Sequence, residues 1–504
     1  MSNLKSLAKD TAIYGMSSIL GKFLNYLLVP LYTASFSAES GGYGVVTNIY
    51  AIVALLQVLL IYGMETGFFR FANKKEENEN TVYSSILISV GSTSLLFVFL
   101  SLVFLNPLSS WLGYADHPEF LGMMAIVVAM DAFQSIPFAY LRHKKRPIKF
   151  AAIKLFSIVF GIGLNLFFLL LCPWLHTHYP ETISWFYNPS YGVGYVFVAN
   201  LITTLFQTVF FIPEFRGFPY KYDRKLMKRI FRYSSPLIIL GVAGVLNQTV
   251  DKILFPFLYP DENEARVQLG IYGATSKIAM VMVMFTQAFR YAYEPFVFSK
   301  NKDGDQREVY ARVMKFFIIF ALLAFLAVMF YMDILRYIIA TDYWEGLDVV
   351  PVVMTAELFM GIYFNLSFWY KLIDETRWGA YFSLIGCTII IVLNVLFVPI
   401  YGYWACAWAG FAGYAVITIL SYLLGQKKYP INYDLKGIGI YVLLAIALYG
   451  ISSLIVPSNI ILRLLFRTVL LFIFIAYTVK KDLPLNQIPI LNRFIKKPCK
   501  PKHR

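Results

Sequence analysis

Hydrophobic positions run in long, unbroken stretches from one end of the chain to the other, and short polar segments separate them. About 20 consecutive apolar residues cross a bilayer as a helix, whereas the strands of a membrane barrel alternate in polarity over roughly ten residues. The continuous runs therefore predict transmembrane helices. We count fourteen of them, over residues 11–33, 43–69, 82–105, 119–141, 149–171, 191–213, 233–258, 268–297, 313–333, 347–370, 378–399, 403–425, 437–456 and 459–479.

The composition agrees with this pattern. Only 14% of the 504 residues are charged, against about 25% in an ordinary soluble domain. We therefore predict an all-α polytopic membrane protein. The first apolar run lacks a small-residue cleavage site and is expected to be a retained anchor rather than a signal peptide. The four cysteines are scattered along the chain and imply no disulfide framework.

The basic residues predict how the chain is oriented. Of the 44 Lys and Arg, 35 fall in segments on one side of the fourteen spans, and only Arg266 and Arg336 fall in segments on the other side. An excess of this kind marks cytoplasmic loops, so both termini are predicted to be cytoplasmic. The basic runs at 142–149 and 221–229 are then topogenic loops, and the net charge of +15 does not indicate a nucleic-acid partner.

The outward loops are short, and the longest covers about residues 172–190. A catalytic domain does not fit in such loops, so the chain is predicted not to be an enzyme. The segment HTHYPE in this loop carries two histidines, but an exposed polar loop is favoured over a metal site. We expect no catalytic residue, no metal and no cofactor.

An internal repeat divides most of the chain. GKFLNYLLVP at 21–30 and NQTVDKILFP at 247–256 lie 226 residues apart, and the same offset carries Gly44 onto Gly270. The repeat predicts two parallel six-helix lobes related by an axis along the membrane normal, a layout used by transporters with alternating access. The expected parts are an N-terminal lobe over 1–215, a cytoplasmic inter-lobe loop over 216–232, a C-terminal lobe over 233–430, two further helices over 431–481, and a basic cytoplasmic tail over 482–504.

One of these spans carries a cluster of polar side chains. Asn247, Gln248, Asp251 and Lys252 fall within an arc of about 140° on a helix, so this wedge should face protein or water rather than lipid. Neighbouring positions on a helix do not face each other well. We therefore expect Asp251 and Lys252 each to find a partner on the next span, at 268–297.

Ionisable groups within membrane spans are functional candidates by default, with an internal structural ion-pair network as the alternative. Asp131 and Glu357 match under the repeat offset and are candidates for proton or sodium coupling. Arg290 and Glu294 are four residues apart and are predicted to pair. The candidate substrate-binding residues are Lys22, Asn25, Arg70, Asn247, Asp251, Lys252, Lys277 and Arg290.

Several segments resemble the motifs of a known family. DKILFPFLYP…LGIYGATSKIA at 251–279, GIYFNLSFWYKLIDETRWGAY at 361–381, NVLFVPIYGYWACAWAGFAGY at 394–414 and YGMETGFFRF at 62–71 are similar to the polysaccharide-transporter branch of the MOP flippases. The 361–381 segment resembles the versions common in Bacteroidota-type members. The resemblance covers essentially the whole chain, and Arg70, Asp251 and Lys252 fall within matched motifs.

The resemblance implies fourteen helices, arranged as two six-helix lobes and two further helices. It also implies a flippase of the bacterial inner membrane that moves polyprenyl-diphosphate-linked oligosaccharide, an O-antigen, capsule or exopolysaccharide unit, to the outer leaflet. Its expected partners are this substrate, membrane lipids and a glycan polymerase or export machinery, and the protein is expected to act as a monomer. The alternatives are a multidrug/cation antiporter of the related branch, a lipid II-type flippase, and a polytopic glycan polymerase or ligase.

Overall fold

The computed structural model describes residues 20–300, apart from Lys22 and Asn25, and residues 307–483. The side chains of Ala292 and of residues 294–300 are not among those described. The predicted site residues Lys22 and Asn25, and the side chain of Glu294, therefore lie outside the described residues.

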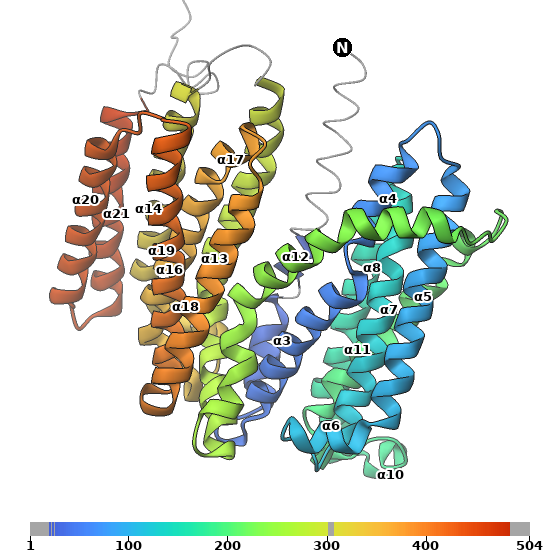
Figure 1. Ribbon diagram of the computed structural model, residues 1–504. Coiled ribbons are helices and arrows are strands. Elements are labelled where there is room, and N and C mark those ends of the chain that lie inside the picture. The colour runs from blue at the N-terminus through green and yellow to red at the C-terminus, as the bar shows by residue number, and fades with distance from the viewer. Residues whose placement is uncertain (1–19, 22, 25, 301–306, 484–504) are drawn as a thin grey trace, which may run out of the picture. The chain divides into compact units, whose positions relative to one another are not determined.

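Helices make up the described part of the chain, and no strand occurs in it (Figure 1). The helices are α2 (Leu28–Ser35), α3 (Gly42–Ile61), α4 (Met64–Ala72), α5 (Glu79–Val103), α6 (Leu105–Trp111), α7 (Pro118–His143), α8 (Pro147–Leu166), α9 (Cys172–His178), α10 (Pro180–Ile183), α11 (Gly194–Val209), α12 (Arg224–Leu258), α13 (Glu262–Lys300), α14 (Arg307–Phe330), α15 (Met332–Leu335), α16 (Val350–Leu366), α17 (Phe368–Leu372), α18 (Arg377–Tyr401), α19 (Tyr403–Lys428), α20 (Leu435–Leu454) and α21 (Ile460–Lys481).

Twelve of these helical segments, counted within the described residues, are long and apolar enough to cross a membrane. The predicted run at 191–213 appears as α11, a shorter apolar helix. The first predicted run, 11–33, is described only in part. The prediction of an all-α polytopic membrane protein is confirmed, while the count of fourteen spans stays a prediction.

One predicted span is broken. The run at 43–69 forms two helices, because Tyr62 and Gly63 both adopt positive φ, at 35° and 72°. Positive φ is unfavourable for a residue with a side chain, and the Tyr62 hydroxyl is held 2.9 Å from Ser89 Oγ. The break re-aims α4, which carries Glu65 and Arg70, relative to α3.

The first turns of α12 fall within the segment that we predicted as the 216–232 loop. Residues from Arg224 onward are helical instead, because the side chain of Asp223 caps the helix by accepting from the backbone N–H groups of Lys225 and Leu226, at 2.8 and 3.0 Å. A side-chain cap of this kind satisfies amides that have no partner within the helix. The start of this helix was not predicted because the segment is rich in polar residues and was interpreted as a loop.

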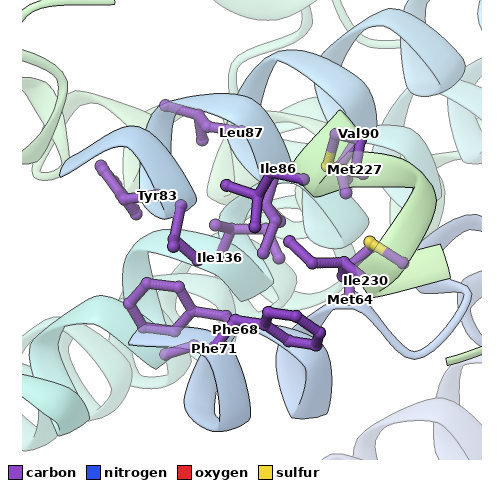
Figure 2. Packing of buried hydrophobic residues seen from close by; sticks show 13 residues of the cluster. Met64, Phe68, Phe71, Tyr83, Ile86, Leu87, Val90, Ile136, Met227 and Ile230 are labelled. Carbon is purple, nitrogen blue, oxygen red and sulfur yellow. The ribbon is translucent and has the colours of Figure 1, made fainter. Parts of the chain in front are cut away.

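A buried apolar cluster then anchors the start of α12. Met227 and Ile230 pack against α5 and against the buried Met64 and Phe68 of α4, and Ile136 of α7 joins the same cluster (Figure 2). This packing fixes the beginning of the helix that carries Asp251 further along.

Mutual packing divides the chain into two compact units, one from residues 1–280 and 337–424 and the other from 281–336 and 425–504. Within the second unit, α14 packs against α20 and α21. Lys315 pairs there with Asp434 and Asp482, at 2.9 and 2.5 Å. These contacts do not test the lobe boundaries at 215 and 430, which remain a prediction.

Within the first unit, α3 and α13 cross at matched positions of the repeat. A Cβ on Gly270 would lie 3.1 Å from the backbone nitrogen of Gly44, and a Cβ on Gly273 would overlap the side chain of Thr47. Both pairs are 226 residues apart. Equivalent residues of two related halves contact each other only where a two-fold axis passes between them, so this crossing supports the repeat.

The contacts around the crossing are also reciprocal. Residues 33–38 of the first half contact 340–343, since Ala340 N–H donates to Thr33 Oγ1 at 3.2 Å and Tyr343 O–H donates to the Phe36 carbonyl at 2.7 Å. In the other direction, Arg266 donates to the Gly113 carbonyl at 2.6 Å. The offset of 226 carries 33–38 onto 259–264 and 114–117 onto 340–343, so the contact of Arg266 with Gly113 lies within two residues of the equivalent positions.

Candidate functional site

The polar wedge of α12 lies inside the first unit. Asp251 is only 7% exposed. Its Oδ2 accepts a hydrogen bond of 3.0 Å from the Tyr272 hydroxyl of α13, as expected of the neighbouring span. Lys252 Nζ lies 2.9 Å from Asp251 Oδ2 and 3.1 Å from Oδ1. Two charges at this depth are tolerated because they neutralise each other and are hydrogen-bonded.

The expectation that Asp251 and Lys252 do not face each other well is therefore wrong, whereas the expected partner on the next span is present: Tyr272 bonds Asp251, and its ring centroid lies 5.1 Å from Lys252 Nζ. Helix geometry separates their Cβ atoms, but the four-carbon stem of lysine is long enough to bring the ammonium back to the adjacent carboxylate. The same ammonium also donates to the Gln248 carbonyl at 3.2 Å. Lys252 is thus largely satisfied within its own helix.

Asn247 ties α12 to its neighbours. Its side-chain nitrogen donates to the carbonyls of Ala243 and Ser383, at 2.7 and 2.8 Å, and its backbone carbonyl accepts from the Tyr414 hydroxyl at 2.8 Å. These bonds join α12 to α18 and α19. Buried amides with partners of this kind orient helices relative to one another, so Asn247 positions the charged pair.

Asn48 and Tyr114 belong to this network and were missed by the sequence analysis. Asn48 of α3 is 2% exposed; it donates to the Lys252 carbonyl at 2.7 Å and accepts from the Tyr114 hydroxyl at 2.8 Å. Outside the polar wedge of α12, the predicted site residues were ionisable groups, apart from Asn25. A lone asparagine in the apolar run after Gly44 was the available signal, because an amide in a membrane span needs an internal partner.

Lys277 and Glu357 extend the charge cluster. Glu357 is close enough to interact electrostatically with Lys252 and Asp251, and Lys277 is close enough to interact with Lys252. Both side chains are half-buried. Among the ion pairs of the described residues, none joins Lys277 to a carboxylate. After Asp251 has neutralised Lys252, Lys277 is the cation of this cluster without a paired acid.

The other coupling candidate has different surroundings. Asp131 of α7 accepts a weak bond from Thr204 Oγ1 at 3.5 Å and interacts electrostatically with Tyr50, which is hydrogen-bonded to Asn200. Asp131 and Glu357 match in the repeat, yet their neighbours differ. The hydroxyls of Thr204 and Tyr50 lie near Asp131, whereas the charged groups of Lys252 and Asp251 lie near Glu357.

The remaining candidates lie elsewhere. Arg70 is exposed, with its guanidinium carbon 4.0 Å above the ring of Tyr233, while Glu65 pairs with Arg142. Arg290 belongs to the second unit and makes interactions of its own. In the described parts of the chain, no group of three His, Cys, Asp or Glu is arranged to hold a metal ion.

A prediction separates charge balance from substrate contact at Lys252. Lys252→Ala is expected to reduce transport about tenfold, because it leaves Asp251 as a buried unpaired carboxylate. If the lysine serves only to neutralise Asp251, the Asp251→Asn/Lys252→Ala double variant should restore transport to within about threefold of the parent. Transport per amount of membrane-inserted protein is the measurement. An inactive double variant that inserts normally would instead assign Lys252 a direct contact with the substrate.

Comparisons with known proteins place this geometry in context. The family model described as "Polysaccharide biosynthesis protein" matches residues 7–292. No curated protein matches the chain. Among solved structures, the fold is similar to the lipid II flippase MurJ in an inward closed conformation, with a TM-score of 0.69 and 16% identity over 93% of this chain and 98% of that one.

Multidrug transporters share the fold as well. An inward-facing MATE family transporter of the MOP superfamily aligns with a TM-score of 0.57 and 12% identity, over 80% of this chain and 93% of that one. The MATE multidrug transporter DinF-BH aligns with a TM-score of 0.56 and 15% identity, over 83% of this chain and 95% of that one. Identities this low show a shared fold and leave the substrate open.

Proposed function

Because the chain belongs to the polysaccharide biosynthesis protein family, we propose that it is a flippase for polyprenyl-diphosphate-linked oligosaccharide, such as an O-antigen, capsule or exopolysaccharide repeat unit. It moves this substrate from the inner to the outer leaflet by alternating access. The MurJ structure, titled a lipid II flippase, supports a lipid-linked substrate through its shared fold. The proposed location is the bacterial inner membrane, with both termini cytoplasmic.

One observation carries the proposal: a half-buried cation without a paired acid lies beside a neutralised pair. Lys277 interacts with Lys252 and has no paired carboxylate among the described residues, whereas Lys252 is held by Asp251. An unneutralised ammonium at membrane depth is costly unless an anion or water reaches it. The diphosphate of a lipid-linked sugar is an anion that can do so while its polyprenyl tail stays in the bilayer.

The other candidate residues take secondary roles in this proposal. Asn247 orients α12 and Asp251 neutralises Lys252, and Lys22, Asn25, Arg70 and Arg290 are proposed as further contacts for the substrate. Asp131 and Glu357 are proposed to couple transport to protons or sodium. The protein acts as a monomer in this scheme, beside a glycan polymerase or export machinery.

Deletion of the gene tests the proposal. We expect lipid-linked repeat units to accumulate in the inner leaflet and one surface glycan to disappear, with both effects reversed by a plasmid copy. Normal export of every surface glycan, in a strain without a paralogue, would contradict the proposal.

A multidrug/cation antiporter is the second candidate, because MATE transporters share the fold. Vesicles containing the purified protein distinguish the two functions. A flippase should translocate a fluorescent lipid-linked oligosaccharide, while an antiporter should expel a cationic dye when a proton or sodium gradient is applied. A lipid II-type substrate is tested in the same vesicles by exchanging the headgroup.

A further inference from the structure

A pocket of about 290 Å³ opens at the end of the first unit where α3 and α7 begin. Its lining includes Tyr114, Asp116, Phe120, Tyr191 and Arg266. In the predicted orientation this end faces away from the cytoplasm, since Arg266 is one of the two basic residues in the outward segments. A hollow of this volume accommodates one sugar ring, and the function proposed above does not use it.

One wall of the pocket is aromatic and firmly held. Phe120 is 3% exposed, and the ring of His117 stacks on it with the centroids 4.7 Å apart and the planes 9° apart. Tyr191 meets Phe120 edge to face at 5.7 Å. Because Phe120 is buried beneath His117, the accessible rings of this wall are those of His117 and Tyr191. They offer an apolar platform against which the C–H face of a sugar ring can pack.

Arg266 supplies a guanidinium to the lining of the pocket, and Glu262 forms an ion pair with it. One of its terminal nitrogens donates to the Gly113 carbonyl and to Glu262 Oε1, both at 2.6 Å, and the side chain is 28% exposed. A guanidinium has five N–H donors, and both of these bonds use Nη2, so the donors of Nε and Nη1 remain for a ligand of the pocket that Arg266 lines. Arginine binds a carboxylate in a paired, planar geometry. Asp116, exposed on the rim, adds an acceptor for hydroxyl groups.

The pocket is also connected to the charge cluster of α12. Tyr114 lines the pocket and donates to Asn48, which in turn donates to the Lys252 carbonyl. The main chain of Arg266 packs at the α3–α13 crossing, where a Cβ on Gly44 would overlap its carbonyl. A ligand on Arg266 and Tyr114 therefore contacts the groups that join the two halves at this end.

We propose that this pocket binds a sugar residue that carries a carboxylate, with Arg266 as the ligand of the acid and the rings of His117 and Tyr191, supported by the buried Phe120, as the platform for the sugar ring. This proposal rests on the proposed function, because that function makes the ligand part of a glycan. It predicts that the transported glycan contains an acidic sugar. Binding to the isolated protein tests it separately from transport.

Saturation-transfer NMR on the full-length protein in lipid nanodiscs provides the test, with glucuronate as the probe and glucose and acetate as matched comparisons. We expect transfer to the ring protons of glucuronate at least fivefold stronger than to glucose. Arg266→Gln should remove it, and Tyr191→Ala should reduce it at least threefold. Arg232→Gln, an exposed arginine on α12 outside the pocket, is the control and should leave the signal unchanged.

Three results would overturn the proposal. Equal transfer to glucose and glucuronate would remove the role of the acid. Displacement of glucuronate by an equal concentration of acetate would show that the pocket binds small anions without recognising the sugar ring. An unchanged signal in both Arg266→Gln and Tyr191→Ala would place the sugar elsewhere. None of these results affects the deletion phenotype, so failure here and failure of the flippase proposal are distinguishable.

Discussion

Lys277→Met is expected to reduce transport of the lipid-linked substrate at least about tenfold, a loss of roughly 1.4 kcal/mol, without lowering the thermal stability of the purified protein. An unpaired buried charge costs free energy in the folded state, so its replacement by an apolar side chain of similar length should be neutral or stabilising. A loss of transport at equal or higher stability would show that Lys277 serves the substrate rather than the fold. Transport in vesicles and the unfolding temperature in detergent are the two measurements.

A second half-buried lysine within a predicted span provides the matched control. Lys154 Nζ of α8 lies 5.5 Å from the centroid of the Phe150 ring and 5.8 Å from that of Phe138. Lys154→Met should keep transport within about twofold of the parent. If Lys277→Met instead unfolds at a lower temperature, with transport falling only in proportion to folded protein, Lys277 has a structural role and the anion site is wrong.

The sequence determines the helical class of this protein because apolar side chains must fill every membrane span. The finer breaks were not predictable in the same way. Tyr62 adopts positive φ in an apolar run that contains no proline, and its ring contact with Phe231 and its hydrogen bond with Ser89 hold it there. The helical start at Arg224 was hidden because its outer face is basic, and its buried face consists of a few residues such as Met227 and Ile230.

The candidate site shows the same limit. Helical periodicity correctly placed Asp251 and Asn247 on an inward wedge, because it fixes the direction of each Cα–Cβ bond. It does not fix side-chain rotamers, so the return of the Lys252 ammonium to Asp251 was not foreseen. Contacts between distant segments, such as those of Asn48 with Tyr114 and the Lys252 carbonyl, depend on how the helices pack.

The repeat was read from weak sequence matches, and the structure gives them a physical cause. Gly44 and Gly270 both lie where the backbones of α3 and α13 are in close contact, and a larger residue at either position would push the helices apart. At these two positions the repeat is explained by a shared steric requirement for glycine. The matched acids Asp131 and Glu357 share no such requirement, because their neighbours differ. A test of the crossing is consequently more decisive about the conformational cycle than a test of the acids.

Gly44→Val is expected to weaken the closed α3–α13 crossing and to abolish efficient transport. The new Cβ would overlap the Arg266 carbonyl, and a backbone group cannot move aside as a flexible side chain can. Overpacking of this kind costs about 1–3 kcal/mol, which corresponds to roughly a five- to 150-fold shift between the closed and open arrangements of this end. Under alternating access, the protein should then accumulate with this end open.

A reporter at the crossing measures that shift. Thr47 lies beside Gly273, so Thr47→Cys in a background without native cysteines should be shielded from a membrane-impermeant maleimide when the crossing is closed. Adding Gly44→Val should raise its labelling rate at least fivefold. Gly244→Val is the matched control, because a Cβ on Gly244 has no atom within 4 Å, and it should change neither labelling nor transport. Equal behaviour of the two valine variants would show that the Gly44 contact does not limit the opening of this end, and the crossing would then have no role as a gate.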